Sequence, residues 1–137
     1  MRLLILISMI FMLWACGSHK NMMSHAYPLD GTWIPVRQEF GGMTLHAAAF
    51  NHQSLILKDS TYTVMAESVD KGIVQYHDQK MDIYGREGVN AGKHFTALYK
   101  FDHGQLTICY DLKGGSYPSD FTTKANTMLF LAEFKRQ

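Results

Sequence analysis

Apolar and polar residues alternate with a period of two along most of the chain beyond residue 28. This period places successive side chains on opposite faces of a strand. In 94–101, for example, Phe95 and Tyr99 fall on one face, and the Asp102-His103-Gly104 that follows has the composition of a hairpin turn. We predict eight strands, at 33–40, 54–58, 61–67, 73–77, 81–86, 94–101, 105–111 and 127–135.

Short turns between successive strands favour an antiparallel up-and-down arrangement. Eight such strands are expected to close into a barrel, because closure leaves no unpaired edge. The segment 44–53 departs from the strand pattern, since Leu45, Ala48 and His52 fall at helical spacing behind Thr44, a residue suited to an N-cap. The predicted fold is therefore all-β, an eight-stranded antiparallel up-and-down β-barrel with one short helix after the first strand.

The first fifteen residues have the features of a secretory signal. Arg2 supplies the positive start, and 3–14 form an apolar run that is too short to span a bilayer. The run ends in Leu13-Trp14-Ala15-Cys16, which resembles a bacterial lipobox, although Trp14 is larger than is usual there. This resemblance implies that Cys16 is diacylated and becomes the new N-terminus. An ordinary signal peptide cut after Ala15, with Cys16 as a free thiol, is the alternative.

These features divide the chain into a signal peptide at 1–15, a lipidated cysteine with a flexible tether at 16–28, and a barrel domain at 29–137. Two or three acyl chains would anchor the protein stably in a membrane. Gly17 follows Cys16 in place of the aspartate that retains some lipoproteins in the inner membrane. We therefore expect a lipid-anchored protein of the cell envelope, at the outer membrane and facing the periplasm.

Short motifs across 29–136, in a fixed order, resemble a family of bacterial lipocalin-like domains found in exported proteins and common in planctomycetes. The matching residues are Leu29, Gly31, Thr32, Trp33, Tyr62, Thr63, Val64, Gly92, Lys93, Tyr99, 106–110, Pro118, Phe121, Phe134, Lys135 and Arg136. The resemblance implies a barrel whose floor is closed by Trp33 against a late basic residue, Lys135 or Arg136, through a cation–π contact. It implies no particular activity.

Charge and composition exclude several function classes. Of the 13 Lys and Arg residues, Arg2 lies in the predicted signal, which leaves 12 against 12 Asp and Glu. A neutral domain lacks the basic surface of a nucleic-acid binder. The chain has seven His residues but no His-x-His, His-Glu-x-x-His, Cys-x-x-Cys or Gly-x-Ser-x-Gly motif. We therefore predict no metal site, no cofactor and no enzyme activity.

Some residues with reactive side chains have simple structural interpretations. The neighbouring pairs His77-Asp78 and Asp102-His103 lie at predicted turns. Cys109 falls in an apolar strand, and with Cys16 lipidated it would have no disulfide partner. We expect Cys109 to be a buried, inert thiol.

Two binding functions follow from the predicted fold. An eight-stranded barrel is just wide enough to be filled by side chains or to hold one small ligand. The first hypothesis is a small apolar or amphipathic ligand inside the barrel, with walls that include Phe95, Tyr99, Phe101, Leu106 and Tyr110. The second is a protein-binding lipoprotein of inhibitor or immunity type that acts through the long loop at 113–125. In that case Tyr117 is expected to be exposed at a Gly-rich tip.

Overall fold

The computed structural model describes residues 28–137. The predicted signal peptide, the lipidation site Cys16 and all of the tether except Pro28 lie outside the described residues. Within 28–137, no helix has both the length and the apolar character needed to cross a membrane.

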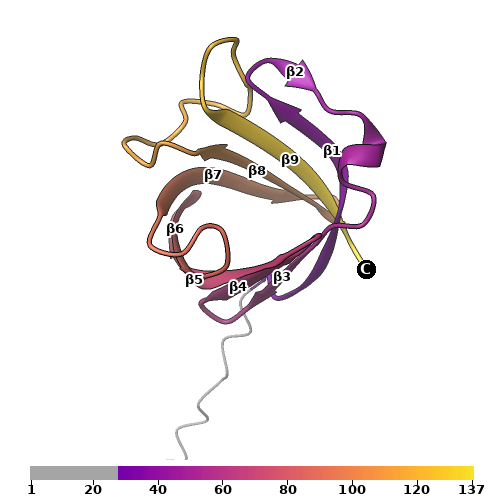
Figure 1. Cartoon of the computed structure of the whole chain (residues 1–137), viewed down its shortest axis with the longest axis vertical. Coiled ribbons are helices and arrows are strands. Elements are labelled where there is room, and N and C mark those ends of the chain that lie inside the picture. Colours follow the sequence, from indigo (N-terminus) through magenta and orange to yellow (C-terminus); the bar gives the residue numbers. More distant parts are fainter. Residues whose placement is uncertain (1–27) are drawn as a thin grey trace, which may run out of the picture.

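The described chain forms one antiparallel sheet that closes on itself (Figure 1). Its strands are β1 (Gly31–Phe40), β2 (Met43–Thr44), β3 (Ser54–Lys58), β4 (Thr61–Met65), β5 (Val69–His77), β6 (Lys80–Glu87), β7 (His94–Asp102), β8 (Gln105–Asp111) and β9 (Leu129–Arg136). From β3 onward each strand pairs with the next, β3 also pairs with β1, and β9 pairs back with β1. The predicted closed barrel of eight antiparallel strands is confirmed, with β2 as a two-residue addition to β1.

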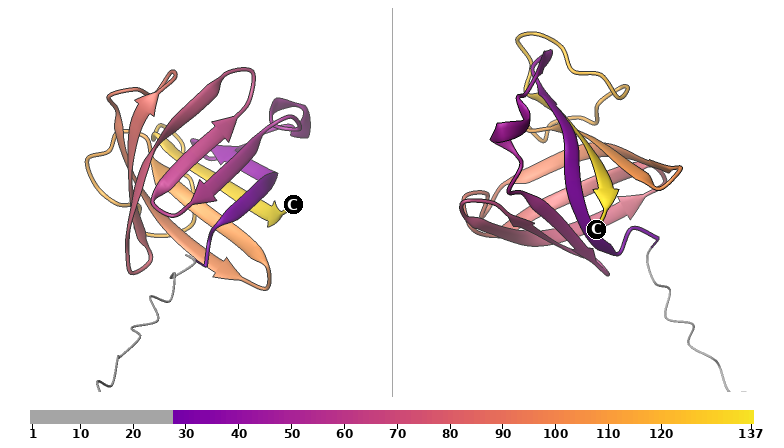
Figure 2. Two further views of the ribbon diagram at one scale, coloured as in Figure 1. Left: turned by 90° about the horizontal axis from the view of Figure 1, so that it is seen from below. Right: turned by 90° about the vertical axis from the view of Figure 1, so that its right-hand side faces the viewer.

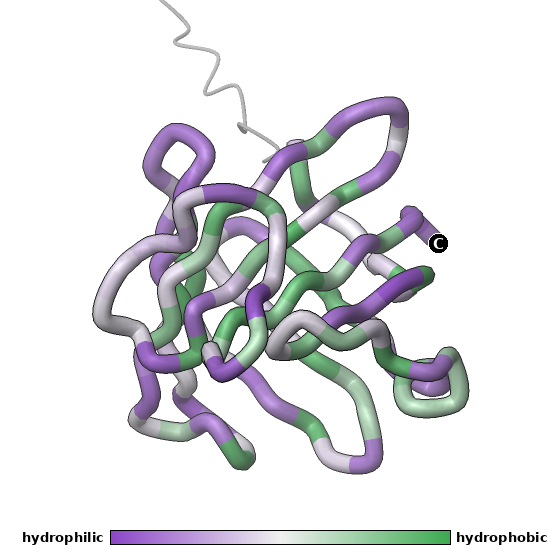
Figure 3. The backbone as a smooth tube through the Cα atoms, turned by 90° about the horizontal axis from the view of Figure 1, so that it is seen from above, coloured by the Kyte–Doolittle hydropathy of each residue, from purple (hydrophilic) through white to green (hydrophobic). Residues whose placement is uncertain are grey.

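The strands run obliquely around the barrel, and the two views of Figure 2 show its closed wall from below and from one side. Hydrophobic and hydrophilic positions alternate along the tube of Figure 3, and several turns are hydrophilic. The inward positions form one apolar core that includes Trp33, Leu57, Met81 and Ile108. One strand begins earlier than predicted. We expected a turn at 68–72, but Val69 pairs with Met65 and starts β5.

The predicted helix at 44–53 is wrong. Thr44 belongs to β2, where it pairs with Glu39, and the only helical turn in the segment is the 3-10 turn Ala47–Ala49. His46 caps this turn, because its Nδ1 accepts a hydrogen bond from the Ala48 amide at 3.3 Å. The three alanines are exposed. A longer helix here would have had no apolar face to bury, and packing of such a face supplies most helix stability in proteins.

Trp33 closes one end of the barrel. Its side chain is fully buried, and its Nε1 donates a hydrogen bond to the Leu29 carbonyl at 2.8 Å. The Arg136 guanidinium lies 4.3 Å from the centre of the indole ring. It also donates hydrogen bonds to the carbonyl oxygens of Asp30 and Pro28. Gly31, at φ +145°, has no side chain, and a Cβ there would collide with the Arg136 guanidinium.

Of the two basic residues expected from the resemblance as partners of Trp33, Arg136 makes the contact and Lys135 does not. Both residues are exposed, but Arg136 follows Phe134 by two positions and lies on the Trp33 side at the end of β9, whereas Lys135 lies on the opposite face. The edge of the Phe101 ring also approaches the indole, with ring centres 5.7 Å apart. Trp33, Phe101 and Arg136 therefore pack together at this end of the barrel.

Candidate functional site

A cavity of about 190 Å³ lies inside the barrel, away from Trp33. Its walls are mostly apolar, with Leu55, Leu57, Val74, Met81, Ile83 and Ile108 among the lining residues. Its rim is formed where strands begin or end, as shown by Gln38 late in β1, Ser54 at the start of β3 and Phe130 near the start of β9. These are the strand ends opposite the Trp33 closure, so the cavity occupies the other end of the barrel.

The structure divides the five residues that we expected to line a ligand site. Phe95 and Tyr110 line the cavity. Tyr99 and Phe101 line a separate hollow of about 290 Å³ near Pro28 and Leu29, at the closed end. Leu106 is fully buried and lines neither.

The division of these residues has a simple geometric cause. Phe95, Tyr99 and Phe101 share one face of β7, as the alternation indicates, but Phe95 and Phe101 are six residues apart. At about 3.3 Å per residue, that separation is roughly 20 Å along the strand. A period of two identifies the inward face of a strand but not the depth of a residue within the barrel.

Tyr110 offers a hydroxyl group to the cavity from β8. Its ring packs against Phe130, with ring centres 5.7 Å apart. Burial raises the pKa of Tyr110 well above its usual value, and the nearby Tyr76 and Tyr62 add to the shift. The hydroxyl is therefore protonated at neutral pH and can donate as well as accept a hydrogen bond.

Asp70 brings a carboxylate to the rim of the cavity. Its Oδ2 accepts hydrogen bonds from the Tyr62 hydroxyl and the Asn90 side-chain amide, and its Oδ1 accepts one from the Asn90 backbone amide, each at 3.0 Å. Burial, followed by the hydrogen bond and the charge of Asp70, raises the pKa of Tyr62. Asp70 itself is only 6% exposed. The two hydrogen bonds from Asn90 hold the β6–β7 loop against the barrel rim, and the bond from Tyr62 ties Asp70 to β4.

The fold makes room for this loop at Gly85. A Cβ at Gly85 would collide with the Asn90 carbonyl, so a residue with a side chain there would displace the loop. Asp70 was not predicted as a site residue because the strand was expected to begin only at residue 73. Had the strand been extended to Val69, Asp70 would have shared the inward face of β5 with Val74, and a carboxylate on an inward face is itself a functional signal.

A second polar cluster lies outside the cavity, on the outward face of β6. Asp82 is at its centre, with His77 Nε2 at 2.9 Å, His94 Nε2 at 2.7 Å and the Tyr117 hydroxyl at 2.6 Å. Burial would raise the pKa of Asp82, but hydrogen bonds from Tyr117, His94 and His77 outweigh it and lower that pKa. The His94 ring also stacks on Tyr84, with ring centres 4.5 Å apart.

Of the neighbouring pairs at the predicted turns, Asp102-His103 does form a contact, with His103 Nδ1 2.8 Å from Asp102 Oδ1, whereas His77 bonds to a carboxylate on the next strand. His77 contacts Asp82 across the hairpin, whereas the neighbouring Asp78 accepts a hydrogen bond from the Tyr99 hydroxyl at its carbonyl oxygen. Neither hollow is lined by Asp82, His77 or His94. Within 28–137 no group of three His, Cys, Asp or Glu side chains is arranged to hold a metal ion. The cluster holds the loop that carries Tyr117 against the barrel wall.

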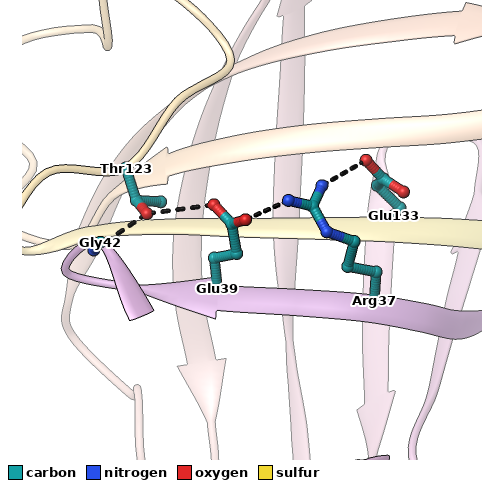
Figure 4. Close-up of polar contacts among 5 residues, drawn as sticks. All are labelled: Arg37, Glu39, Gly42, Thr123 and Glu133. Carbon is teal, nitrogen blue, oxygen red and sulfur yellow. Dashed lines mark hydrogen bonds and ion pairs between the residues drawn. The ribbon is translucent and has the colours of Figure 1, made fainter. Parts of the chain in front are cut away.

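The loop at 113–125 is fixed to the wall at a second point, shown in Figure 4. Thr123 Oγ1 donates a hydrogen bond to Glu39 at 3.2 Å and accepts one from the Gly42 amide at 3.0 Å. Arg37 in turn bridges Glu39 and Glu133. The expectation of an exposed Tyr117 at the loop tip is wrong, because this side chain is half-buried and bonded to Asp82.

Cys109 lies beneath the same loop and is fully buried, as the strand pattern predicts. Its Sγ is 4.0 Å from the Thr122 carbonyl oxygen. Burial, followed by the charges of Asp120, Glu39 and Asp111, raises the pKa of this thiol to about 11. The thiol is therefore protonated at neutral pH and is a poor nucleophile.

Comparison of the chain with protein-family models, with curated proteins and with solved structures finds no match in any of the three.

Proposed function

We propose that this protein is a lipocalin-like, membrane-anchored envelope lipoprotein that binds a small apolar or amphipathic ligand inside its barrel. The observation that supports the proposal is the cavity of about 190 Å³ with mostly apolar walls and a few polar groups at its rim. Ligand sites in proteins commonly combine a largely apolar lining with a small number of placed polar groups.

The volume limits the size of the ligand. Known sites for drug-sized ligands measure roughly 300–1,000 Å³, and an engineered apolar cavity of about 150 Å³ binds benzene. The cavity here measures about 190 Å³. We therefore propose a ligand of one ring with short substituents, or an aliphatic molecule of the same volume. The ring would contact Phe95 and Tyr110, and a polar substituent would lie toward the rim.

The membrane anchor is compatible with this use of the barrel. Pro28 and Leu29 lie at the closed end, beside Trp33 and Arg136. Acyl chains on Cys16 would therefore attach the protein through the end opposite the cavity. The rim would stay accessible to ligand in the periplasm, and the anchor would not have to detach.

The alternative, a protein-binding lipoprotein that acts through the loop at 113–125, has less support. The aromatic residues that could anchor a partner are already engaged, since Tyr117 bonds to Asp82 and the Phe121 ring lies 4.8 Å from Lys100 Nζ. Interfaces usually depend on a few aromatic or Arg side chains that bury themselves in the partner.

Binding can be tested with a set of one-ring compounds added to the purified protein while backbone amide NMR signals are recorded. We expect saturable shifts at residues that line the cavity. Val64→Phe, which adds volume at the cavity wall, should abolish them. The matched control Val36→Phe, at a position 44% exposed outside the cavity, should leave them unchanged. Equal binding by both variants, or saturable shifts confined to residues outside the cavity, would contradict the proposal.

A further inference from the structure

The cavity carries one formal charge. Among its lining residues, Asp70 is the only one with an acidic side chain, and no Lys, Arg or His contributes to the wall. Asp70 is 94% buried, and the donors to its carboxylate are Tyr62 and Asn90, both neutral. Lys93 contacts the Asn90 side-chain carbonyl at 3.3 Å, so its hydrogen bond goes to the amide partner of Asp70.

A buried carboxylate with only neutral partners is costly to keep ionised, and a cation beside it reduces that cost. The three hydrogen bonds to Asp70 leave acceptor capacity unused, because a carboxylate has about four lone-pair sites. Two of these bonds reach Oδ2 and one reaches Oδ1. The carboxylate therefore has an acceptor site left for a further donor while Tyr62 and Asn90 stay bound.

We propose, on the basis of the function proposed above, that the ligand is a small organic cation, an ammonium group attached to one ring or to a short apolar frame. The ammonium would bond Asp70 at the rim, and the apolar part would lie among Val74, Met81 and Ile108. A neutral molecule of the same shape can bond Asp70 but does not offset its charge. An anion of the same shape is repelled by it.

Three compounds of one shape test the charge preference. Benzylamine is cationic at neutral pH, benzyl alcohol is neutral, and benzoate is anionic. We expect the purified protein to bind benzylamine most tightly, with roughly tenfold to hundredfold lower affinity for benzyl alcohol and no detectable binding of benzoate. Both compounds can donate a hydrogen bond to Asp70, but only the ammonium also offsets its charge, and each tenfold step in affinity corresponds to about 1.4 kcal/mol. Calorimetric titration provides the affinities.

The variant Asp70→Asn removes the charge and retains a side-chain oxygen at the same place. It should lower the affinity for benzylamine roughly tenfold or more and that for benzyl alcohol by a clearly smaller factor. The matched control Asp82→Asn removes an equivalent charge from the outer wall and should leave both affinities unchanged. Because the three-compound comparison uses the unaltered protein, the test does not depend on whether Asp70→Asn folds.

The outcomes separate the two proposals. If benzyl alcohol or benzoate binds at least as well as benzylamine, the preference for a cation is refuted and the barrel is still a ligand-binding site. If none of the three binds, and no other one-ring compound does, both proposals are refuted. If benzylamine binds most tightly but Asp70→Asn and Asp82→Asn weaken it equally, then Asp70 is not the group that recognises the charge, and the inference is refuted.

Discussion

Replacing Arg136 with alanine tests how the barrel is closed. The substitution removes the guanidinium that lies 4.3 Å from the centre of the Trp33 ring and the hydrogen bonds that it donates to Asp30 and Pro28. A cation–π contact at an exposed site contributes about 0.5–1 kcal/mol. Each hydrogen bond contributes about 0.5–1.5 kcal/mol net, and exposure favours the low end of that range.

Together these terms predict a loss of about 2 kcal/mol in the free energy of unfolding. For a domain of about 100 residues, such a loss corresponds to a fall of roughly 8 °C in melting temperature. Urea denaturation followed by Trp33 fluorescence would measure the first quantity, and circular dichroism on heating the second. Arg136→Lys should recover only part of the loss, because an ammonium lacks the planar fork that reaches both carbonyls.

The neighbouring residue provides the matched control. Lys135 is exposed on the opposite face of β9, so Lys135→Ala should change stability by less than about 0.5 kcal/mol. If Lys135→Ala and Arg136→Ala have equal effects, the assignment of Arg136 as the closing residue is wrong. The same conclusion follows if Arg136→Ala unfolds at the wild-type urea concentration.

Three further predictions concern the outer wall. Because the pKa of Asp82 is lowered in the folded state, its carboxylate stabilises the fold above the unfolded-state pKa of about 3.9, and this stabilisation is lost as pH falls through the lower folded pKa. Asp82→Asn should therefore reduce the dependence of the urea midpoint on acid pH, and an unchanged dependence would contradict the stabilising role of this carboxylate. Tyr117→Phe removes the hydroxyl that bonds Asp82 and should cost about 1 kcal/mol, with faster amide hydrogen exchange across 113–125 than in the wild type; unaltered exchange would show that the bond does not hold the loop. The Cys109 thiol, with its pKa raised to about 11, should react with iodoacetamide at pH 8 only after urea unfolds the protein, whereas rapid labelling of the native state would contradict its burial.

The strands could be predicted from the sequence because one face of each packs in the barrel and the other meets solvent or the covering loop. That alternation fixes the inward residues of β7, where Phe95 and Tyr99 share a face. The same argument fails for the segment 44–53. An amphipathic helix needs apolar residues at helical spacing, as Leu45 and Ala48 are, but it also needs a surface against which they pack. Here Ala48 is exposed and Leu45 only partly buried.

The site was harder to predict than the fold because it depends on depth and on contacts between distant strands. Period two does not show that Phe101 lies beside Trp33 while Phe95 lines the cavity. The contact between Asp82 and Tyr117 joins residues 35 positions apart. Asp70 was missed for a local reason, since the turn before β5 is shorter than its composition suggests.

The pairing of β1 with β9 has a consequence for how the chain is made. Trp33 and Arg136 are register partners, so the first strand finds its second neighbour only when nearly all of the chain is available. Bringing such distant segments together costs conformational entropy before any contact rewards it, and topologies of this kind fold slowly. A nascent chain would therefore carry two open sheet edges until its last residues emerge, and a translation product that stops before β9 would keep them.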